Sequence, residues 1–158
     1  MAKYSYTMND NRYLTPPILI KNGLKLLSEL KGIILADEFD LDVCCSFENV
    51  PAKEYFKYPK HDGLVEDWKK YNWCNPPFNN CEKWVKKAYT ESLKGNNTIM
   101  LIPVRTETNY WHKYILYPQT DNVNVVWLRK GYKFLNADTK EEMGIFKNAL
   151  AFVVFKGL

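Results

Sequence analysis

The chain contains 158 residues, and its hydrophobic fraction of 46% and aromatic fraction of 15% are sufficient to fill one core of ordinary size. No apolar run approaches the length of a membrane span, and the N-terminus carries no secretory hydrophobic core, so neither a membrane nor a secreted protein is expected. The net charge of +4 is compatible with a polyanionic partner but is too small to argue for one. We expect a single cytoplasmic domain over residues 1–158.

The first part of the chain predicts a helix, a buried strand and a turn. Thr15-Pro16-Pro17 is typical of a helix start with Thr15 as the cap, because proline is tolerated in the first turn. Residues 39–44 indicate a buried strand, and residues 48–56 indicate a short helix or turn. Within the first helix, which extends to Gly32, the apolar residues at helical spacing are Ile20, Leu24, Leu27 and Leu30.

The middle of the chain predicts a second strand followed by an amphipathic helix. Residues 71–74 are strand-like, and residues 80–94 have helical periodicity with Gly95 as the C-cap. The inward positions of this helix are Cys81, Trp84, Val85, Ala88 and Leu93, and the outward positions are Lys83, Lys86, Lys87 and Glu91.

The last part of the chain predicts a central strand and then a β-rich tail. Residues 98–104 form a continuous apolar run, which is typical of a central parallel strand, and residues 108–116 are expected to be helical. The strand-like segments 123–128, 132–135 and 150–155 follow without long helices, which suggests an antiparallel C-terminal edge. The whole pattern predicts a three-layer α/β fold with a mostly parallel sheet.

Cysteine usage argues against a metal centre. The chain has no Cys-x-x-Cys pair, and adjacent cysteines bridge each other only with strain, so a zinc site is disfavoured. Buried, reduced thiols in a cytosolic protein are the better interpretation of Cys44, Cys45, Cys74 and Cys81.

The segment Asn75-Pro76-Pro77-Phe78 carries the clearest chemistry. Its prolines offer no N–H donors, so the loop presents carbonyl oxygens, to which Asn75 adds a side-chain oxygen and Phe78 an aromatic face. Oxygens of Asn75 and Pro76 that accept both hydrogens of an adenine N6 amine would turn its lone pair toward an electrophile and stabilise the arriving positive charge. Phe78 would stack on the base, which must be flipped out of a duplex. The alternative is an ordinary surface turn.

The chain resembles the phage-type DNA N-6-adenine methyltransferase (Dam) family over most of its length. The segments that carry the resemblance are Leu14-Thr15-Pro16, Leu41-Asp42-Val43-Cys44-Cys45-Ser46 with Glu48-Asn49, Asp62-Gly63-Leu64 with Asp67-Trp68, Trp73-Cys74-Asn75-Pro76-Pro77-Phe78, Trp84-Val85-Lys86-Lys87-Ala88, Leu101-Ile102-Pro103-Val104-Arg105-Thr106-Glu107-Thr108 with Trp111-His112, and residues 149–155. The resemblance implies a class I methyltransferase fold, S-adenosylmethionine as donor, double-stranded DNA as substrate and a phage or prophage source. Two positions depart from the family: Phe78 stands where Tyr is usual, and Lys147-Asn148 where a Pro-Ser pair is more frequent.

The donor site is expected beyond the carboxyl ends of the strands, where ligands bind in open α/β sheets. Asp42 is a candidate partner for the cationic donor or its amino group, and by resemblance Thr15 and Pro16 lie across the methionine end. Asp62 and Asp67 are rivals for the adenine or ribose, with Asp62 favoured because Gly63 lets its loop bend. The predicted donor-binding set is Thr15, Pro16, Asp42, Val43, Cys44, Ser46, Asn49 and Asp62.

The DNA contacts are expected on the same rim. Arg105, Thr106 and Thr108 follow the central strand and fit phosphates or a base edge, although either threonine could instead cap the next helix. Trp111 fits a wedge in the duplex or a core residue. Arg129 is a further phosphate contact, while its neighbour Lys130 is interpreted as a solubilising side chain, as are Lys83, Lys86 and Lys87.

Three functions of different classes follow from these residues. The leading hypothesis is a site-specific DNA adenine-N6 methyltransferase, and the second is a methyltransferase acting on RNA adenine or protein glutamine. The third is a catalytically silent DNA-binding relic. A homodimer is compatible with the chain, but nothing in the sequence supports one.

Overall fold

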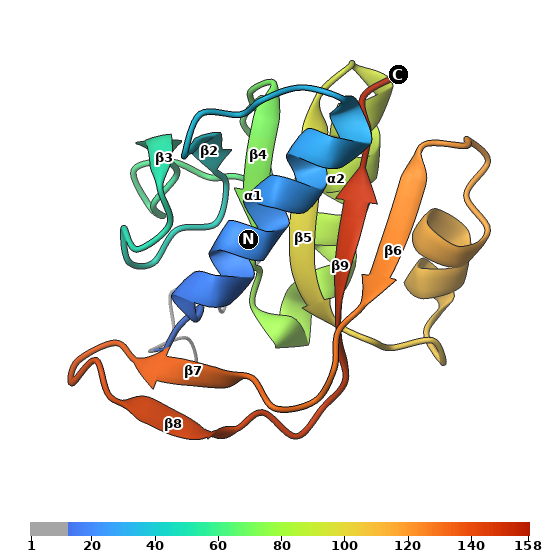
Figure 1. The fold of residues 1–158 in the computed structure, drawn as a ribbon. Helices are drawn as coiled ribbons and strands as arrows, with labels where there is room; N and C mark the ends of the chain where they lie inside the picture. The colour runs from blue at the N-terminus through green and yellow to red at the C-terminus, as the bar shows by residue number, and fades with distance from the viewer. Residues whose placement is uncertain (1–12) are drawn as a thin grey trace.

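The computed structural model describes residues 13–158, and its centre is a six-stranded sheet with the order β3-β2-β4-β5-β9-β6 (Figure 1). The strands β3, β2, β4 and β5 are parallel to one another, whereas β9 is antiparallel to both β5 and β6. The strands are β2 (Phe39–Asp42), β3 (Ala52–Tyr55), β4 (Tyr71–Cys74), β5 (Asn97–Pro103), β6 (Val123–Trp127) and β9 (Leu150–Phe155). This arrangement confirms the prediction of a mixed, mostly parallel α/β sheet.

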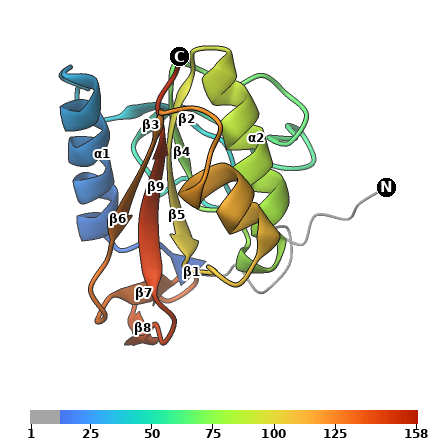
Figure 2. The same cartoon turned by 90° about the vertical axis from the view of Figure 1, so that its right-hand side faces the viewer.

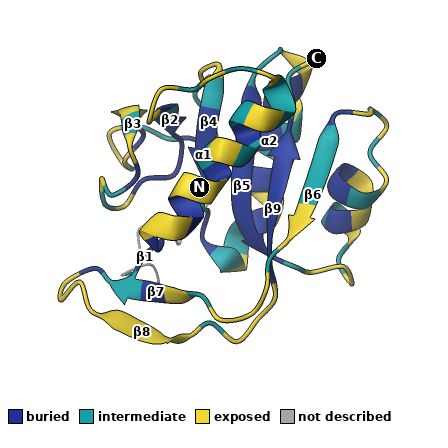
Figure 3. Ribbon diagram, viewed as in Figure 1, coloured by how far each residue is buried: buried dark blue, intermediate teal, exposed yellow. Residues whose placement is uncertain are grey.

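Helices cover both faces of the sheet, α1 (Pro17–Lys31) on one and α2 (Cys81–Leu93) on the other (Figure 2). The alternation of side chains along β5 explains the two contacts: Ile99 and Leu101 pack toward α1, while Met100 and Ile102 pack toward α2. All seven residues of β5 are buried, and β9 beside it is buried throughout (Figure 3). A continuous apolar run therefore becomes the central strand, as predicted.

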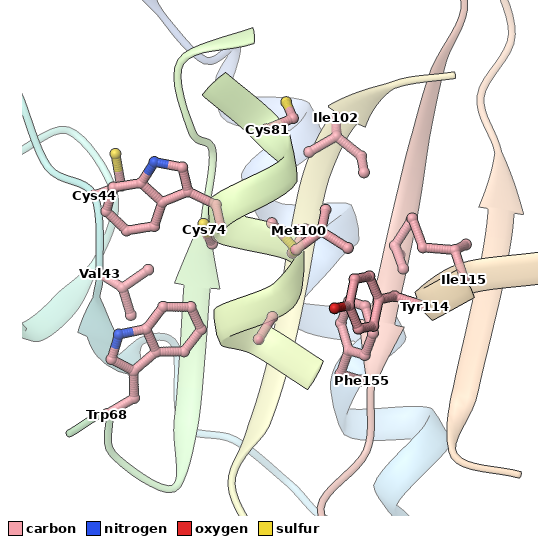
Figure 4. Close-up of a cluster of buried hydrophobic side chains, with 14 of the residues drawn as sticks. Val43, Cys44, Trp68, Cys74, Cys81, Met100, Ile102, Tyr114, Ile115 and Phe155 are labelled. Carbon is pink, nitrogen blue, oxygen red and sulfur yellow. The ribbon is translucent and has the colours of Figure 1, made fainter. Parts of the chain in front are cut away.

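All four cysteines lie in the interior as free thiols, in keeping with the sequence-based interpretation. Cys44, Cys74 and Cys81 belong to the cluster on the α2 side of the sheet (Figure 4). No helix formed by residues 13–158 combines the length and the apolar character that crossing a membrane requires.

A second, three-stranded sheet with the order β1-β7-β8 lies beyond the carboxyl end of β5 (Figure 1). It is formed by β1 (Tyr13–Leu14), β7 (Lys133–Asn136) and β8 (Glu142–Ile145). The prediction that residues 132–135 extend the edge of the main sheet is therefore wrong, because β7 leaves that sheet and pairs with β1. The main sheet ends at β6, and its one antiparallel strand, β9, is interior rather than terminal.

Four local predictions also need correction. Residues 52–55 form strand β3 rather than a helix or turn. Pro16, not Thr15, occupies the N-cap position of α1, although the helix does end at Gly32 in the left-handed conformation. In the last turn of α2, Glu91 was predicted to point outward but is 0% exposed, and Leu93 was predicted to point inward but is 48% exposed. The C-cap of α2 is Lys94, one residue before the predicted Gly95.

Candidate active site

An open pocket lies where β2 and β4 end. It brings together most of the residues that the sequence assigned to the donor and to the reacting base, from segments far apart in the chain. The lining residues are Tyr13, Thr15, Asp42, Cys44, Ser46, Phe47, Asn49, Val50, Trp73, Asn75 and Pro76. Because β2 and β4 are adjacent and parallel, their carboxyl ends deliver Asp42 and Asn75 to the same crevice.

Asn75 is held in one orientation. Its Nδ2 donates a hydrogen bond of 2.8 Å to Oγ1 of Thr15, which is itself 4% exposed. Its Oδ1 is buried and has no hydrogen-bond partner among residues 13–158. An unpaired buried acceptor costs roughly 1–3 kcal/mol, so a native structure keeps one where it has a use. Thr15 therefore serves Asn75 rather than the helix to which the sequence assigned it.

The neighbouring carbonyls of the loop differ in their availability. No hydrogen bond to the Pro76 carbonyl forms within the described chain, and Pro76 lines the pocket. The Pro77 carbonyl is already engaged, since it accepts a hydrogen bond of 3.0 Å from Asn80 N and one of 3.6 Å from Cys81 Sγ. Asn75 and Pro76 are thus the two residues of the motif that present acceptors to the pocket.

Asp42 supplies a desolvated carboxyl group to the same pocket. It is 4% exposed, and burial raises its pKa from 3.8 to about 7, against the opposing effect of hydrogen bonds from the Cys44 backbone and the Cys45 side chain. The bond from Cys44 N to Oδ1 measures 3.2 Å. Burial likewise raises the pKa of Cys44 well above its ordinary value, so this pocket residue is a neutral thiol and not a nucleophile.

Phe78 does not line the pocket. It is half-buried in an aromatic cluster with Tyr13, Phe134 and Phe146. Its ring centroid lies 5.5 Å from that of Phe146 at an angle of 69°, and 6.5 Å from that of Phe134 at 78°. Edge contacts of this kind fix the plane of a ring while leaving part of its face uncovered.

Three of the predicted donor contacts, Pro16, Val43 and Asp62, do not line the pocket. Val43 is fully buried, and Gly63 packs closely against its carbonyl oxygen. A Cβ added at Gly63 would lie only 2.1 Å from that oxygen. The loop of Asp62 is therefore packed on the end of β2, and Asp62 Oδ1 accepts a hydrogen bond of 2.9 Å from Leu64 N. Its rival Asp67 is paired with Lys94 at 2.9 Å.

The predicted DNA-contacting residues occupy three different environments. Arg105, Thr106 and Thr108 form an exposed turn after β5, in which Thr108 Oγ1 donates to the Arg105 carbonyl at 2.6 Å. Trp111 is a core residue, which is the alternative that the sequence left open. Its side chain is 0% exposed, and its ring stacks on that of Trp127 with the centroids 6.2 Å apart. The side chain therefore does not reach the surface where a duplex would lie. Arg129 lies in the loop between β6 and β7.

Sequence reasoning missed four lining residues: Tyr13, Phe47, Val50 and Trp73. Trp73 stands two residues before Asn75 on β4, so its strand position was a usable signal. Tyr13 gave no local signal, because β1 reaches the pocket only through its pairing with β7, more than a hundred residues away in the chain.

The family model described as DNA N-6-adenine-methyltransferase (Dam) matches residues 28–157, and the chain belongs to this family. Among curated proteins, a DNA N-6-adenine-methyltransferase of Haemophilus phage HP1 (strain HP1c1) is 28% identical over 106 residues, which are 66% of this chain and 60% of that protein. A DNA N-6-adenine-methyltransferase of Escherichia phage T1 is 24% identical over 94 residues, 58% of this chain and 37% of that protein. The chain thus matches less than two thirds of the length of either relative. No solved structure gives a significant match.

Proposed function

We propose that the protein is a DNA adenine-N6 methyltransferase that transfers a methyl group from S-adenosylmethionine to a flipped-out adenine of double-stranded DNA. The observation that carries this proposal is the buried, unpartnered Oδ1 of Asn75 beside the carbonyl of Pro76. The two phage relatives bear the name of this activity. We further propose a single domain over residues 1–158 that acts in the cytoplasm of a bacterial or phage-infected cell.

The sheet supports assignment to the class I methyltransferase fold. A mostly parallel sheet with one antiparallel strand, β9, between β5 and β6 and with helices on both faces is compatible with that fold. In such sheets the ligand crevice lies outside the carboxyl ends of the parallel strands, which is where the pocket of Asp42 and Asn75 lies.

The pocket residues fit a cationic donor. A buried carboxyl group whose pKa is raised to about 7 lacks a positive partner, and the sulfonium or ammonium group of S-adenosylmethionine would provide one. Ser46 and Asn49 add polar groups, while Tyr13, Phe47 and Trp73 add aromatic walls. When bound, the donor supplies an electrophilic methyl group. Asp62 does not line the pocket, but its loop packs against the end of β2 through Gly63, and we keep Asp62 as a proposed donor contact.

Methyl transfer needs an amine whose lone pair is directed at the electrophile. Asn75 Oδ1 and the Pro76 carbonyl would each accept one N–H of adenine N6, and both would stabilise the positive charge that develops on nitrogen. Thr15 Oγ1 holds the amide by accepting from Nδ2, so that Oδ1 stays directed at the base. The surplus proton leaves to water after transfer, so no general base is required. Phe78 would stack on the base with its ring plane fixed by the aromatic cluster.

The proposal is tested by incubating the protein with labelled donor and unmethylated duplex DNA, RNA or protein, and by identifying the methylated product. We expect N6-methyladenine in DNA. Replacing Asn75→Ala should lower kcat by about 100-fold or more, as loss of an oxyanion-hole donor does, without lowering donor affinity. Asn22→Ala on the exposed face of α1 is the matched control and should leave kcat unchanged. Methylation of RNA or protein alone, or an unchanged kcat in Asn75→Ala, would overturn the proposal.

A further inference from the structure

A second pocket lies between the loop that joins β6 to β7 and the loop that joins β8 to β9. Three cationic residues line it, Arg129, Lys130 and Lys147, and no acidic residue does. None of the three forms an ion pair within residues 13–158, whereas Lys133 on the adjacent strand is paired with Glu142 at 3.6 Å. A cluster of unpaired cations is a site for an anionic partner.

The two loops are tied together and hold these cations in place. Leu128 N donates to the Leu150 carbonyl at 3.0 Å, and Phe146 N donates to the Tyr132 carbonyl at 3.1 Å. These bonds continue the pairing of β6 with β9 into the pairing of β7 with β8. The result is a hairpin over residues 128–150, called the ribbon below, which projects beyond the carboxyl end of β5 (Figure 1). Its strand β7 also pairs with β1, so β8 is the outer strand.

The outer strand of the ribbon is open to a partner. All four residues of β8 are exposed: Met143 at 42% and Ile145 at 47% are apolar, and the charge of Glu142 is paired with Lys133. The turn at its end is stiffened by Asn136, whose Oδ1 accepts hydrogen bonds from Asp138 N at 2.8 Å and Thr139 N at 3.0 Å.

The ribbon is also seated on the catalytic loop. Phe134 from β7 and Phe146, which follows β8, both contact the ring of Phe78, and they contact each other at 5.5 Å. A partner bound along the ribbon is therefore placed at a defined position relative to Asn75 and Pro76.

We propose that the ribbon is the DNA-docking element: its outer strand β8 faces the major groove, while Arg129, Lys130 and Lys147 contact the phosphates beside it. The wide major groove of B-form DNA admits β-structure, whereas the major groove of an RNA duplex is too narrow for it. The phosphate contacts fix the position of the duplex, and β8 lies where base edges are exposed. This inference rests on the proposed function and assigns the surface that brings DNA to the reaction site. It also revises the interpretation of Lys130 as a merely solubilising residue.

The first test is the triple variant Arg129→Ala, Lys130→Ala, Lys147→Ala, compared with Lys25→Ala, Lys31→Ala, Lys70→Ala, which removes the same charge elsewhere on the surface. Binding to an unmethylated DNA duplex is measured by titration at several salt concentrations. We expect the ribbon variant to bind about tenfold more weakly at low salt, with a log–log salt slope smaller by about 0.9 for each lost contact. Donor binding should not change, and the control should keep the wild-type slope.

The second test addresses the outer strand. Met143→Asp places a carboxylate where the proposal puts a DNA groove, and Val65→Asp makes the same change at a site that is 73% exposed and outside the ribbon. We expect only Met143→Asp to weaken DNA binding. Equal losses in the two Asp variants, or in the two triple variants, would overturn the inference even if wild-type protein methylates DNA. Wild-type protein that binds DNA through the ribbon but transfers no methyl group would instead contradict the proposed function and leave the docking surface standing.

Discussion

Asp42 and Glu91 are buried carboxyl groups at opposite ends of the parallel strands. Asp42 lies at their carboxyl ends, and Glu91, on α2, lies near their amino ends. The pKa values of the two groups move in opposite directions. Burial raises the pKa of Asp42 to about 7, because the hydrogen bonds that it accepts are too few to compensate. Burial also raises that of Glu91, but hydrogen bonds from Lys87, Asn96 and Lys94 outweigh it and the pKa falls below its ordinary value. Lys87 Nζ lies 2.8 Å from Glu91 Oε1, and Lys94 Nζ lies 3.0 Å from it.

The difference between the two carboxyl groups shows that buried polar side chains serve two purposes in this fold: some stabilise it, and others are available for ligands. Around Glu91, near the amino ends of the parallel strands, the buried amides are paired: Asn72 Nδ2 donates to the Asn97 carbonyl at 2.9 Å, and Asn122 Nδ2 donates to Ser92 Oγ at 3.0 Å. The hydroxyl of Thr98 is the exception, since it has no partner among residues 13–158. Around Asp42, the carboxyl end keeps an unpartnered amide oxygen on Asn75 and an uncompensated carboxyl group. The first end stabilises the fold, and the second keeps polar groups available for ligands.

The largest effect is expected at Glu91. Glu91→Ala removes the one acceptor shared by two lysines and Asn96, and the loss of one partner of a buried pair typically costs 3–5 kcal/mol. Because Lys94 is half-exposed and partly screened, we expect the low end, about 3 kcal/mol at pH 7. Since the pKa of folded Glu91 is lowered, this contribution is present above the ordinary carboxyl pKa and disappears as the pH falls through the folded value.

Urea unfolding at pH 7 and at pH 3 measures this prediction. Glu29→Ala is the control, because Glu29 is exposed on α1 and its ion pair with Lys25 is long, at 3.8 Å. We expect the control to change the free energy of unfolding by less than about 0.5 kcal/mol. A Glu91→Ala protein as stable as Glu29→Ala at pH 7 would contradict the structural role.

The next effect is expected at Asp42, where function and stability should separate. Since its folded pKa is about 7 against an ordinary value of 3.8, the unfolded chain binds fewer protons between these values, so stability falls as the pH rises from about 4 to about 7. Asp42→Asn removes this penalty and should raise the free energy of unfolding at pH 8 by about 2 kcal/mol, after allowance for burial of the amide. Affinity for S-adenosylmethionine should fall by about 100-fold, since the cation loses its partner.

Calorimetry of donor binding and urea unfolding, both at pH 8, check these two outcomes together. Asp37→Asn is the control, because Asp37 is exposed and lies outside the donor pocket. Wild-type donor affinity should rise with pH through about 7 as Asp42 ionises, and Asp42→Asn should lose that dependence. A variant that is less stable than wild type at pH 8, or that binds the donor normally, is inconsistent with the assignment.

The sequence predicted the parts of the fold that are encoded locally. The apolar run of β5, the periodicity of α2 and the helix stop at Gly32 all appear in the structure. The sequence places the motif at Asn75 and the carboxylate at Asp42 in one crevice, because Asn75 directly follows β4, Asp42 is the last residue of β2, and parallel strands bring their carboxyl ends together.

Non-local pairing accounts for most of what the sequence did not predict. β7 and β1 are short, and nothing in either indicates that they pair across most of the chain. Helical periodicity predicted that Glu91 points outward. It points inward because Lys87, Lys94 and Asn96 all contact its carboxylate. The hydrogen bond that Asn75 Nδ2 donates to Thr15 Oγ1 likewise joins segments sixty residues apart, whereas the sequence indicated only a local role for Thr15, as a helix cap.

A smaller effect is expected at Thr15. It tests whether the polar groups at the carboxyl ends of the strands are oriented for the reaction. Thr15→Val keeps the shape but removes the acceptor for Asn75 Nδ2, so the amide loses its fixed orientation. We expect kcat to fall by about tenfold, the usual value of one hydrogen bond, while the donor Kd stays within about twofold. Thr15→Ser should restore most of the rate, because its hydroxyl can accept the same bond. A parallel loss of donor affinity would instead place Thr15 in the donor site, and equal rates in the two variants would exclude a positioning role.

The smallest effect is expected at Arg105, the basic residue nearest the carboxyl end of β5. Its Nε is paired with Glu107 Oε1, and both side chains are more than half exposed, so the pair is weak and screened by salt. If Arg105 contacts phosphate, Glu107 competes with DNA for it, and Glu107→Gln should tighten DNA binding by about two- to threefold at low salt. The gain should vanish in Arg105→Ala and at high salt, which titrations of all four combinations of the two substitutions will measure. An equal gain with Ala at position 105 would show that Glu107 acts only through net charge, and the phosphate contact would then belong to the ribbon cations alone.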